Sequence, residues 1–129
     1  FMAHTLTDNK TLEEGWDILQ SIMSADLQML RDNFPNKTLL PTIGNNDVVV
    51  HNNVPCDDVF AQKYYQGLFD IWFPKDHQPQ NFDEEKAHKS FLQGGYYKYD
   101  FKDHNTSLIA LNTMYFNKKN ICQLEKAKV

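Results

Sequence analysis

Apolar residues recur at three- and four-residue spacing from Leu12 to Leu30. This spacing predicts an amphipathic helix of several turns that ends before Phe34-Pro35. Thr11 and Glu14 stand at the spacing of a capping box, which marks the start of the helix. Because a helix followed directly by a strand is half of a β-α-β unit, the pattern also predicts a strand before this helix.

The next apolar run, Leu39 to Ile43, has the length and composition of a buried strand. Gly44 interrupts it, short polar side chains follow at 45–47, and a second β-branched run covers Val48 to Val50. In open α/β sheets ligands bind at the carboxyl ends of strands, so this junction is the first place to expect a site. The alternative is a tight turn, because Gly, Asn and Asp tolerate positive φ angles.

The pattern after residue 56 predicts two further helices and a hairpin. Aspartates at 57 and 58 can cap a helix, and a pair of glycines at 94 and 95 should end a shorter one. The predicted elements are a helix from 58 through Leu68, with an apolar cluster up to Pro74, a helix from 83 to 94, and strands at 96–101 and 107–112 joined by a turn at 103–106.

Composition limits the classes of function. The 129 residues are enough for one domain or less, with sufficient apolar content for a core. A formal net charge of −4 without a basic stripe argues against a nucleic-acid-binding surface. We expect no transmembrane segment, because no apolar run approaches the roughly 20 residues that a membrane-spanning helix needs. The first four residues do not resemble a signal peptide.

The two cysteines and the asparagine tripeptides bear on cellular location. Cys56 and Cys122 are too few and too far apart for a zinc module. They could pair with each other, pair with cysteines of another segment, or remain free thiols. N-x-S/T tripeptides begin at Asn9, Asn36 and Asn105, each in a hydrophilic stretch that suits a surface loop. These tripeptides fit a secreted or lumenal glycoprotein.

Three blocks of sequence resemble the calcineurin-like metallophosphoesterases. They read P-T-I-G-N-N-D-V-V-V-H-N at 41–52, F-L-Q-G-G-Y-Y at 91–97 and L-I-A-L-N-T-M-Y-F-N-K-K-N at 108–120. The first block is similar to the GNND and PHN strings of the branch that holds the acid-sphingomyelinase-like phosphodiesterases and the endopolyphosphatases, with Val50 in place of the proline. Because the blocks agree in order and spacing, the resemblance spans nearly the whole chain.

The resemblance implies an α/β fold of mixed α+β type, a portion of a four-layer αββα sandwich. Residues 1–129 would form the middle portion of a single metallophosphoesterase catalytic domain. Phe1 to His4 is similar to the tail of the family's Gly-Asp-x-x-x-His block, and the chain starts one residue after the position of its aspartate. The other metal-ligand blocks find no match between Phe1 and Val129. We therefore expect the remaining segments of the domain to lie outside this chain, and the isolated fragment to be inactive.

The chemistry that the resemblance implies is hydrolysis of a phosphodiester or phosphoanhydride at a pair of divalent cations. Zinc is the first expectation, with manganese, iron or magnesium as alternatives, and most ligands would come from outside this chain. Such cations polarise the phosphoryl oxygen and lower the pKa of a bound water. By the same resemblance, the protein would be secreted or would reside in the lysosomal or vacuolar lumen.

The resemblance also assigns roles to individual residues. Asn45 matches the metal-binding asparagine of the family, whose amide oxygen is a neutral ligand. Asn46 stands where the family usually has histidine, and because an amide cannot act as a general acid, it would contact the substrate phosphate only as a hydrogen-bond donor. The proton for the leaving group would then come from His51 or His4. Asn112 and Tyr115 are further candidates for the substrate groove, with strand packing as the simpler interpretation.

A non-catalytic homologue is the alternative of a different class. Such a protein would keep the fold as a secreted binding or structural domain and would have lost the general acid. Asn46 is the residue that favours this alternative.

Overall fold

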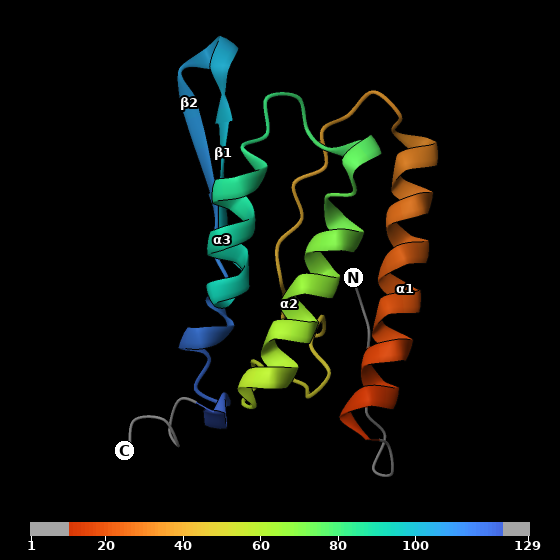
Figure 1. The fold of residues 1–129 in the computed structure, drawn as a ribbon, viewed down its shortest axis with the longest axis vertical. Helices are drawn as coiled ribbons and strands as arrows, with labels where there is room; N and C mark the ends of the chain where they lie inside the picture. The colour runs from red at the N-terminus through yellow and green to blue at the C-terminus, as the bar shows by residue number, and fades with distance from the viewer. Residues whose placement is uncertain (1–10, 123–129) are drawn as a thin grey trace.

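The computed structural model describes residues 11–122, which form three helices and one hairpin. Helix α1 (Leu12–Asn33), helix α2 (Asp58–Trp72) and helix α3 (Glu84–Gly94) are followed by strands β1 (Tyr97–Phe101) and β2 (Thr106–Ala110). The three helices lie side by side in sequence order, with the hairpin beyond α3 (Figure 1). Short 3-10 helices η1 (Lys75–His77), η2 (Lys102–His104) and η3 (Thr113–Phe116) occupy the connections. No helix within residues 11–122 is both long and apolar enough to cross a membrane.

Helix α1 begins and ends where the sequence predicts. The Thr11 side chain accepts a hydrogen bond from the backbone N–H of Glu14 at 3.2 Å, and the Glu14 carboxylate accepts from the backbone N–H of Thr11 at 2.8 Å. This capping box satisfies two backbone donors that the helix itself leaves unpaired. The buried face presents Trp16, Leu19, Met23 and Leu27 to the core.

Helix α2 lies between α1 and α3 and carries the centre of an aromatic core. Its N-terminus is capped by the Asp57 carboxylate, which accepts from the backbone N–H of Phe60 at 2.7 Å. Tyr64 packs edge-on against Trp16 of α1, with ring centroids 5.2 Å apart. Phe91 of α3 contacts Trp72 at a centroid distance of 5.5 Å. The core therefore runs across all three helices.

Helix α3 ends at a left-handed glycine, as predicted. Gly95 has a φ angle of 70°, and its N–H donates to the Phe91 carbonyl oxygen at 2.6 Å. A Cβ at this position would overlap Cδ1 of Ile43, so the backbone conformation and the packing both require glycine. The following strands pair antiparallel, Tyr97 opposite Ala110 and Phe101 opposite Thr106. Asn105 takes a left-handed conformation at the end of the turn, with a φ angle of 47°.

The strand predicted at Leu39 to Ile43 is absent from the described residues, and Val48 to Val50 form bends rather than a second strand. A strand requires a neighbouring backbone for its ladder, and within residues 11–122 only β1 and β2 provide one for each other. Side chains bind the segment instead. The Tyr97 hydroxyl donates to the Pro41 carbonyl oxygen at 2.8 Å, and the Thr42 hydroxyl donates to the Leu111 carbonyl oxygen at 3.1 Å.

The mixed α and β class is confirmed, while the four-layer sandwich stays a prediction about a larger domain. The strand predicted ahead of α1 falls on residues 1–10, outside the described residues. The hairpin strands are slightly shorter than predicted, because Tyr96 precedes β1, and Leu111 and Asn112 follow β2.

Replacement of Gly67 by alanine should destabilise the protein. A Cβ on Gly67 of α2 would overlap Cζ2 of Trp16, whose buried indole has no room to move. Alanine is the better helix former by about 1 kcal/mol, but overpacking a core costs about 1–3 kcal/mol. We expect urea denaturation of Gly67→Ala to give a lower free energy of unfolding. The exposed control Gln62→Ala on the same helix should change little, and a Gly67→Ala protein as stable as wild type would contradict the packing.

Candidate functional site

The polar junction after residue 43 is a tight turn that its own side chain closes. The Asp47 carboxylate accepts from the backbone N–H of Gly44 at 2.9 Å, and the Asp47 N–H donates to the Gly44 carbonyl oxygen at 3.1 Å. The Tyr64 hydroxyl donates to the Asp47 carbonyl oxygen at 2.5 Å from helix α2. The turn is thus held both locally and from the core.

Asp47 is the buried member of the turn, with 3% of its surface exposed. Burial raises the pKa of this carboxyl above its ordinary value, and the hydrogen bond from Gly44 opposes that shift. The buried Asp47 side chain therefore orients the backbone of the turn.

The turn brings two of the predicted site residues together. The Asn45 side-chain amide and the His51 ring are hydrogen-bonded, with Nδ2 and Nε2 3.1 Å apart, and both residues are exposed. The Asn52 N–H donates to the Asn45 carbonyl oxygen at 3.3 Å, and Asn52 has a positive φ angle of 66° that lets the chain fold back. His4, the other predicted proton donor, lies outside the described residues.

Asn46 follows Asn45 in the turn and is half-buried. Its Oδ1 is shielded from solvent and has no hydrogen-bond partner among residues 11–122. A buried amide oxygen without a hydrogen-bond partner costs free energy.

Asn112 and Tyr115 occupy a different position, next to the end of α3. Asn112 is buried, donates to the Gly94 carbonyl oxygen at 3.0 Å, and accepts from the Met114 N–H at 3.2 Å as the cap of η3. The Tyr115 hydroxyl is hydrogen-bonded to the Tyr65 hydroxyl at 3.0 Å, and burial raises the pKa of Tyr65. These contacts are those of packed side chains, so a role in binding substrate stays a prediction.

Residues 52–56 and 117–122, which are far apart in the sequence, are linked to each other beside the candidate site. The Asn117 side chain donates to Oδ1 of Asn52 at 3.3 Å, and the Ile121 N–H donates to Oδ1 of Asn53 at 2.8 Å. A disulfide joins Cys56 to Cys122, with their Cα atoms 5.2 Å apart and a sequence separation of 66. This pairing settles the alternatives that the sequence left open.

Sequence reasoning missed the structural roles of Asn52, Asn53 and Asn117. Asparagine is a common residue in turns, so nothing in the residue type told these three from solvated loop residues. Asn117 falls within the third block that resembles the family, but the resemblance assigns no partner to it.

The described residues do not make a metal site by themselves. No group of three histidine, cysteine, aspartate or glutamate side chains within residues 11–122 is arranged to hold a metal ion. The donors at the candidate site are the amide of Asn45 and the ring of His51. A neutral amide oxygen can complete a cation site whose charged ligands lie elsewhere, but it cannot hold a divalent cation unaided.

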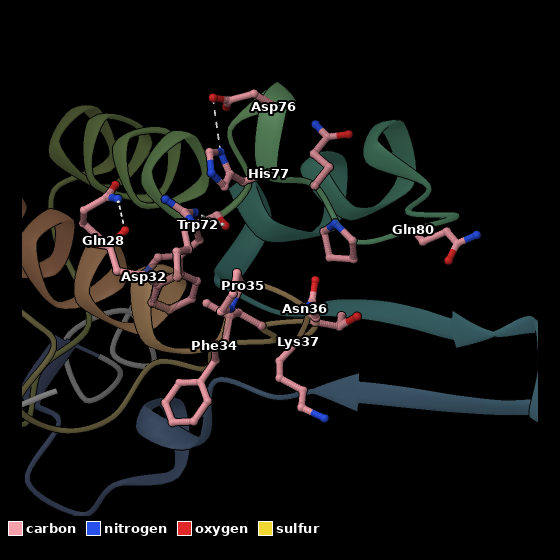
Figure 2. A pocket seen from close by; sticks show the side chains of 15 residues that line it. Gln28, Asp32, Phe34, Pro35, Asn36, Lys37, Trp72, Asp76, His77 and Gln80 are labelled. Atoms are coloured by element: carbon pink, nitrogen blue, oxygen red, sulfur yellow. Dashed lines mark hydrogen bonds and ion pairs between the residues drawn. The ribbon is translucent and has the colours of Figure 1, made fainter.

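A large cavity among the described residues lies apart from this turn. It has a volume of about 650 Å³ and is lined by residues 34–39, by the C-terminal parts of α1 and α2, and by residues 76–80 (Figure 2). Asp76 Oδ2 and His77 Nδ1 lie 3.1 Å apart on its rim. None of the predicted site residues within residues 11–122 lines it.

Taken together, fold and site define a mixed α and β unit with an exposed Asn-His pair on a side-chain-closed turn. No family model matches the chain. The chain is 25% identical over 114 residues to the endopolyphosphatase of Schizosaccharomyces pombe, a match that covers 88% of this chain. The chain spans only 17% of the length of that protein.

The pH dependence of stability should change on replacing Asp47 by asparagine. Because the folded pKa of Asp47 is raised, its contribution to stability is full below the ordinary value of 3.8 and is lost as the pH rises through the raised value. Asparagine can still accept from Gly44 but carries no charge to desolvate. We expect the stability of Asp47→Asn relative to wild type to increase from pH 4 to pH 7, measured by urea denaturation.

Asp47→Ala is the control that removes the hydrogen bond as well. It should be less stable than Asp47→Asn by about 1–3 kcal/mol at every pH, because the Gly44 N–H is then left without its acceptor. If the stability of Asp47→Asn depended on pH in the same way as that of wild type, burial would not raise the pKa of Asp47.

Removal of the disulfide should cost about 4 kcal/mol, the chain-entropy value for a loop of this length. We expect reductant to lower the urea midpoint of wild type and to leave that of the double variant Cys56→Ala/Cys122→Ala unchanged. Hydrogen exchange at the Ile121 N–H should accelerate in the double variant, since its acceptor Asn53 is no longer held nearby. A wild-type midpoint insensitive to reductant would contradict the crosslink.

Proposed function

We propose that this chain is part of the catalytic domain of a metal-dependent phosphoesterase that hydrolyses a phosphodiester or phosphoanhydride bond. The observation that carries the proposal is the similarity to an endopolyphosphatase over 88% of the chain. The three sequence blocks that resemble the acid-sphingomyelinase-like and endopolyphosphatase branch support the same reaction class.

Asn45 supplies one neutral ligand to the metal pair in this proposal. Its side chain is exposed beside His51 on a turn that Asp47 and Tyr64 hold in place, which suits a ligand that must keep its position. Zinc is the expected metal, with manganese, iron or magnesium as alternatives. When bound, the cations would polarise a phosphoryl oxygen and supply a nucleophilic water. The charged ligands belong to segments outside this chain, and the isolated fragment is inactive.

The remaining residues of the turn act on the phosphate. Asn46 donates a hydrogen bond to a phosphoryl oxygen through its amide nitrogen, for which the described residues give no hydrogen-bond partner. His51, or His4 outside the described residues, donates the proton to the leaving group. Asn112 and Tyr115 would border the substrate groove.

The protein acts in a secreted, lysosomal or vacuolar setting in this proposal. Support comes from the Cys56–Cys122 disulfide, because structural disulfides persist in oxidising compartments.

A second candidate function is a non-catalytic binding or structural domain with the same fold. Asn46 favours it, because the position that carries histidine in the resembling family carries an amide here.

Metal analysis and hydrolysis assays on the full-length protein distinguish the two functions. The enzyme should purify with stoichiometric metal and hydrolyse polyphosphate or bis-p-nitrophenyl phosphate. Asn45→Ala should reduce metal content and lower kcat/KM at least about tenfold. The matched control Asn33→Ala, at an exposed asparagine at the end of α1, should leave both unchanged.

Two outcomes would contradict the proposed enzyme or the proposed role of Asn45. If the full-length protein purifies without metal and hydrolyses neither substrate, the second candidate function, a non-catalytic binding domain, replaces the first. Activity that survives Asn45→Ala with full metal content would remove Asn45 from the metal site.

A further inference from the structure

We propose that Asn36 and Asn105 carry N-linked oligosaccharides. Each begins an N-x-S/T tripeptide, with its hydroxyl at Thr38 and Ser107 respectively. The asparagine of the third such tripeptide, Asn9, lies outside the described residues. The structure adds three observations that tripeptide spacing alone does not contain.

The first observation is that both asparagine amides are exposed and uncommitted. Among residues 11–122, no hydrogen bond involves the side chain of Asn36 or Asn105. Most other asparagines of the described chain use their amide nitrogen in the fold: Asn33, Asn45, Asn53, Asn112, Asn117 and Asn120. A sugar on any of these six nitrogens would displace a native contact, whereas one on Asn36 or Asn105 displaces none.

The second observation is that both asparagines lie where the backbone turns outward. Asn36 lies in the turn after α1, where the Lys37 N–H donates to the Phe34 carbonyl oxygen at 3.0 Å. Asn105 lies at the tip of the hairpin in a left-handed conformation. Exposed turns of this kind have room for a bulky polar group.

The third observation is the placement of the two asparagines at one end of the molecule. The turn after α1 and the hairpin tip both lie at the upper end in Figure 1, whereas residues 44–56 lie at the lower end. Sugars at these positions leave the Asn45–His51 pair clear. Asn36 lines the large cavity of Figure 2, so its oligosaccharide would project from the rim of that cavity.

The modification needs an oligosaccharide donor activated as a polyprenyl diphosphate. The Asn Nδ2 forms a bond to C1 of the first sugar, the bond from C1 to the diphosphate oxygen breaks, and the polyprenyl diphosphate leaves. The amide nitrogen loses one proton to base, so no oxidant or reductant takes part. The compartment that holds this donor is oxidising, which agrees with the Cys56–Cys122 disulfide.

Peptide mapping of the full-length protein from its own cells tests the proposal directly. Treatment with an amidase that hydrolyses the side-chain amide of glycosylated asparagine should release oligosaccharide and convert Asn36 and Asn105 to aspartate. A digest without reductant should contain the Cys56–Cys122 crosslinked peptide. Peptides with unmodified Asn36 and Asn105 would overturn the proposal, and an unmodified asparagine at one position would overturn it for that position.

Paired substitutions in the tripeptides exclude a fold effect. Thr38→Ala and Ser107→Ala should each remove one oligosaccharide, while Thr38→Ser and Ser107→Thr keep the tripeptide and should keep it. Asn105→Asp should also remove one, and aspartate tolerates the left-handed conformation. Loss of sugar with Thr38→Ser as well as Thr38→Ala would show that the hydroxyl is not read as part of a tripeptide.

Discussion

The structure depends on the attachment of residues 41–56 to residues 111–122. Neither segment has regular strand structure, so neither can be held by a backbone ladder. Side-chain bonds from Thr42 and Asn117, a backbone bond from Ile121 and the disulfide at Cys56 replace the ladder. Because ordering an irregular segment costs conformational entropy, these links together position the candidate turn.

The helical core supports the same turn from the other side. Tyr64 is fully buried in α2, and its hydroxyl reaches the Asp47 carbonyl oxygen. Gly95 allows Ile43 and the end of α3 to approach closely. The exposed Asn45–His51 pair therefore lies on a turn that buried side chains hold in place, which is the arrangement that a binding or catalytic group needs.

The helices could be predicted from the sequence because their signals are local. Thr11 with Glu14, Asp57 and Gly95 mark helix ends through contacts within a few residues, and apolar periodicity marks the buried faces. The segment Leu39 to Ile43 shows the limit of this reasoning. An apolar run indicates burial, but a strand depends on a neighbour that is remote in sequence, and the described residues supply none. The Asn45–His51 pair lies within one loop and was accessible through resemblance, whereas the links of Asn52, Asn53 and Asn117 arise only in three dimensions.

The covalent ring closed by Cys56 and Cys122 has a consequence for processing of the polypeptide. Helices α2 and α3 and the hairpin all lie within the ring. One backbone cut by a protease between residues 57 and 121 opens the ring but leaves both pieces joined through sulfur. The mass of a cleaved molecule would therefore increase only by that of one water. The molecule would separate into two chains only after reduction.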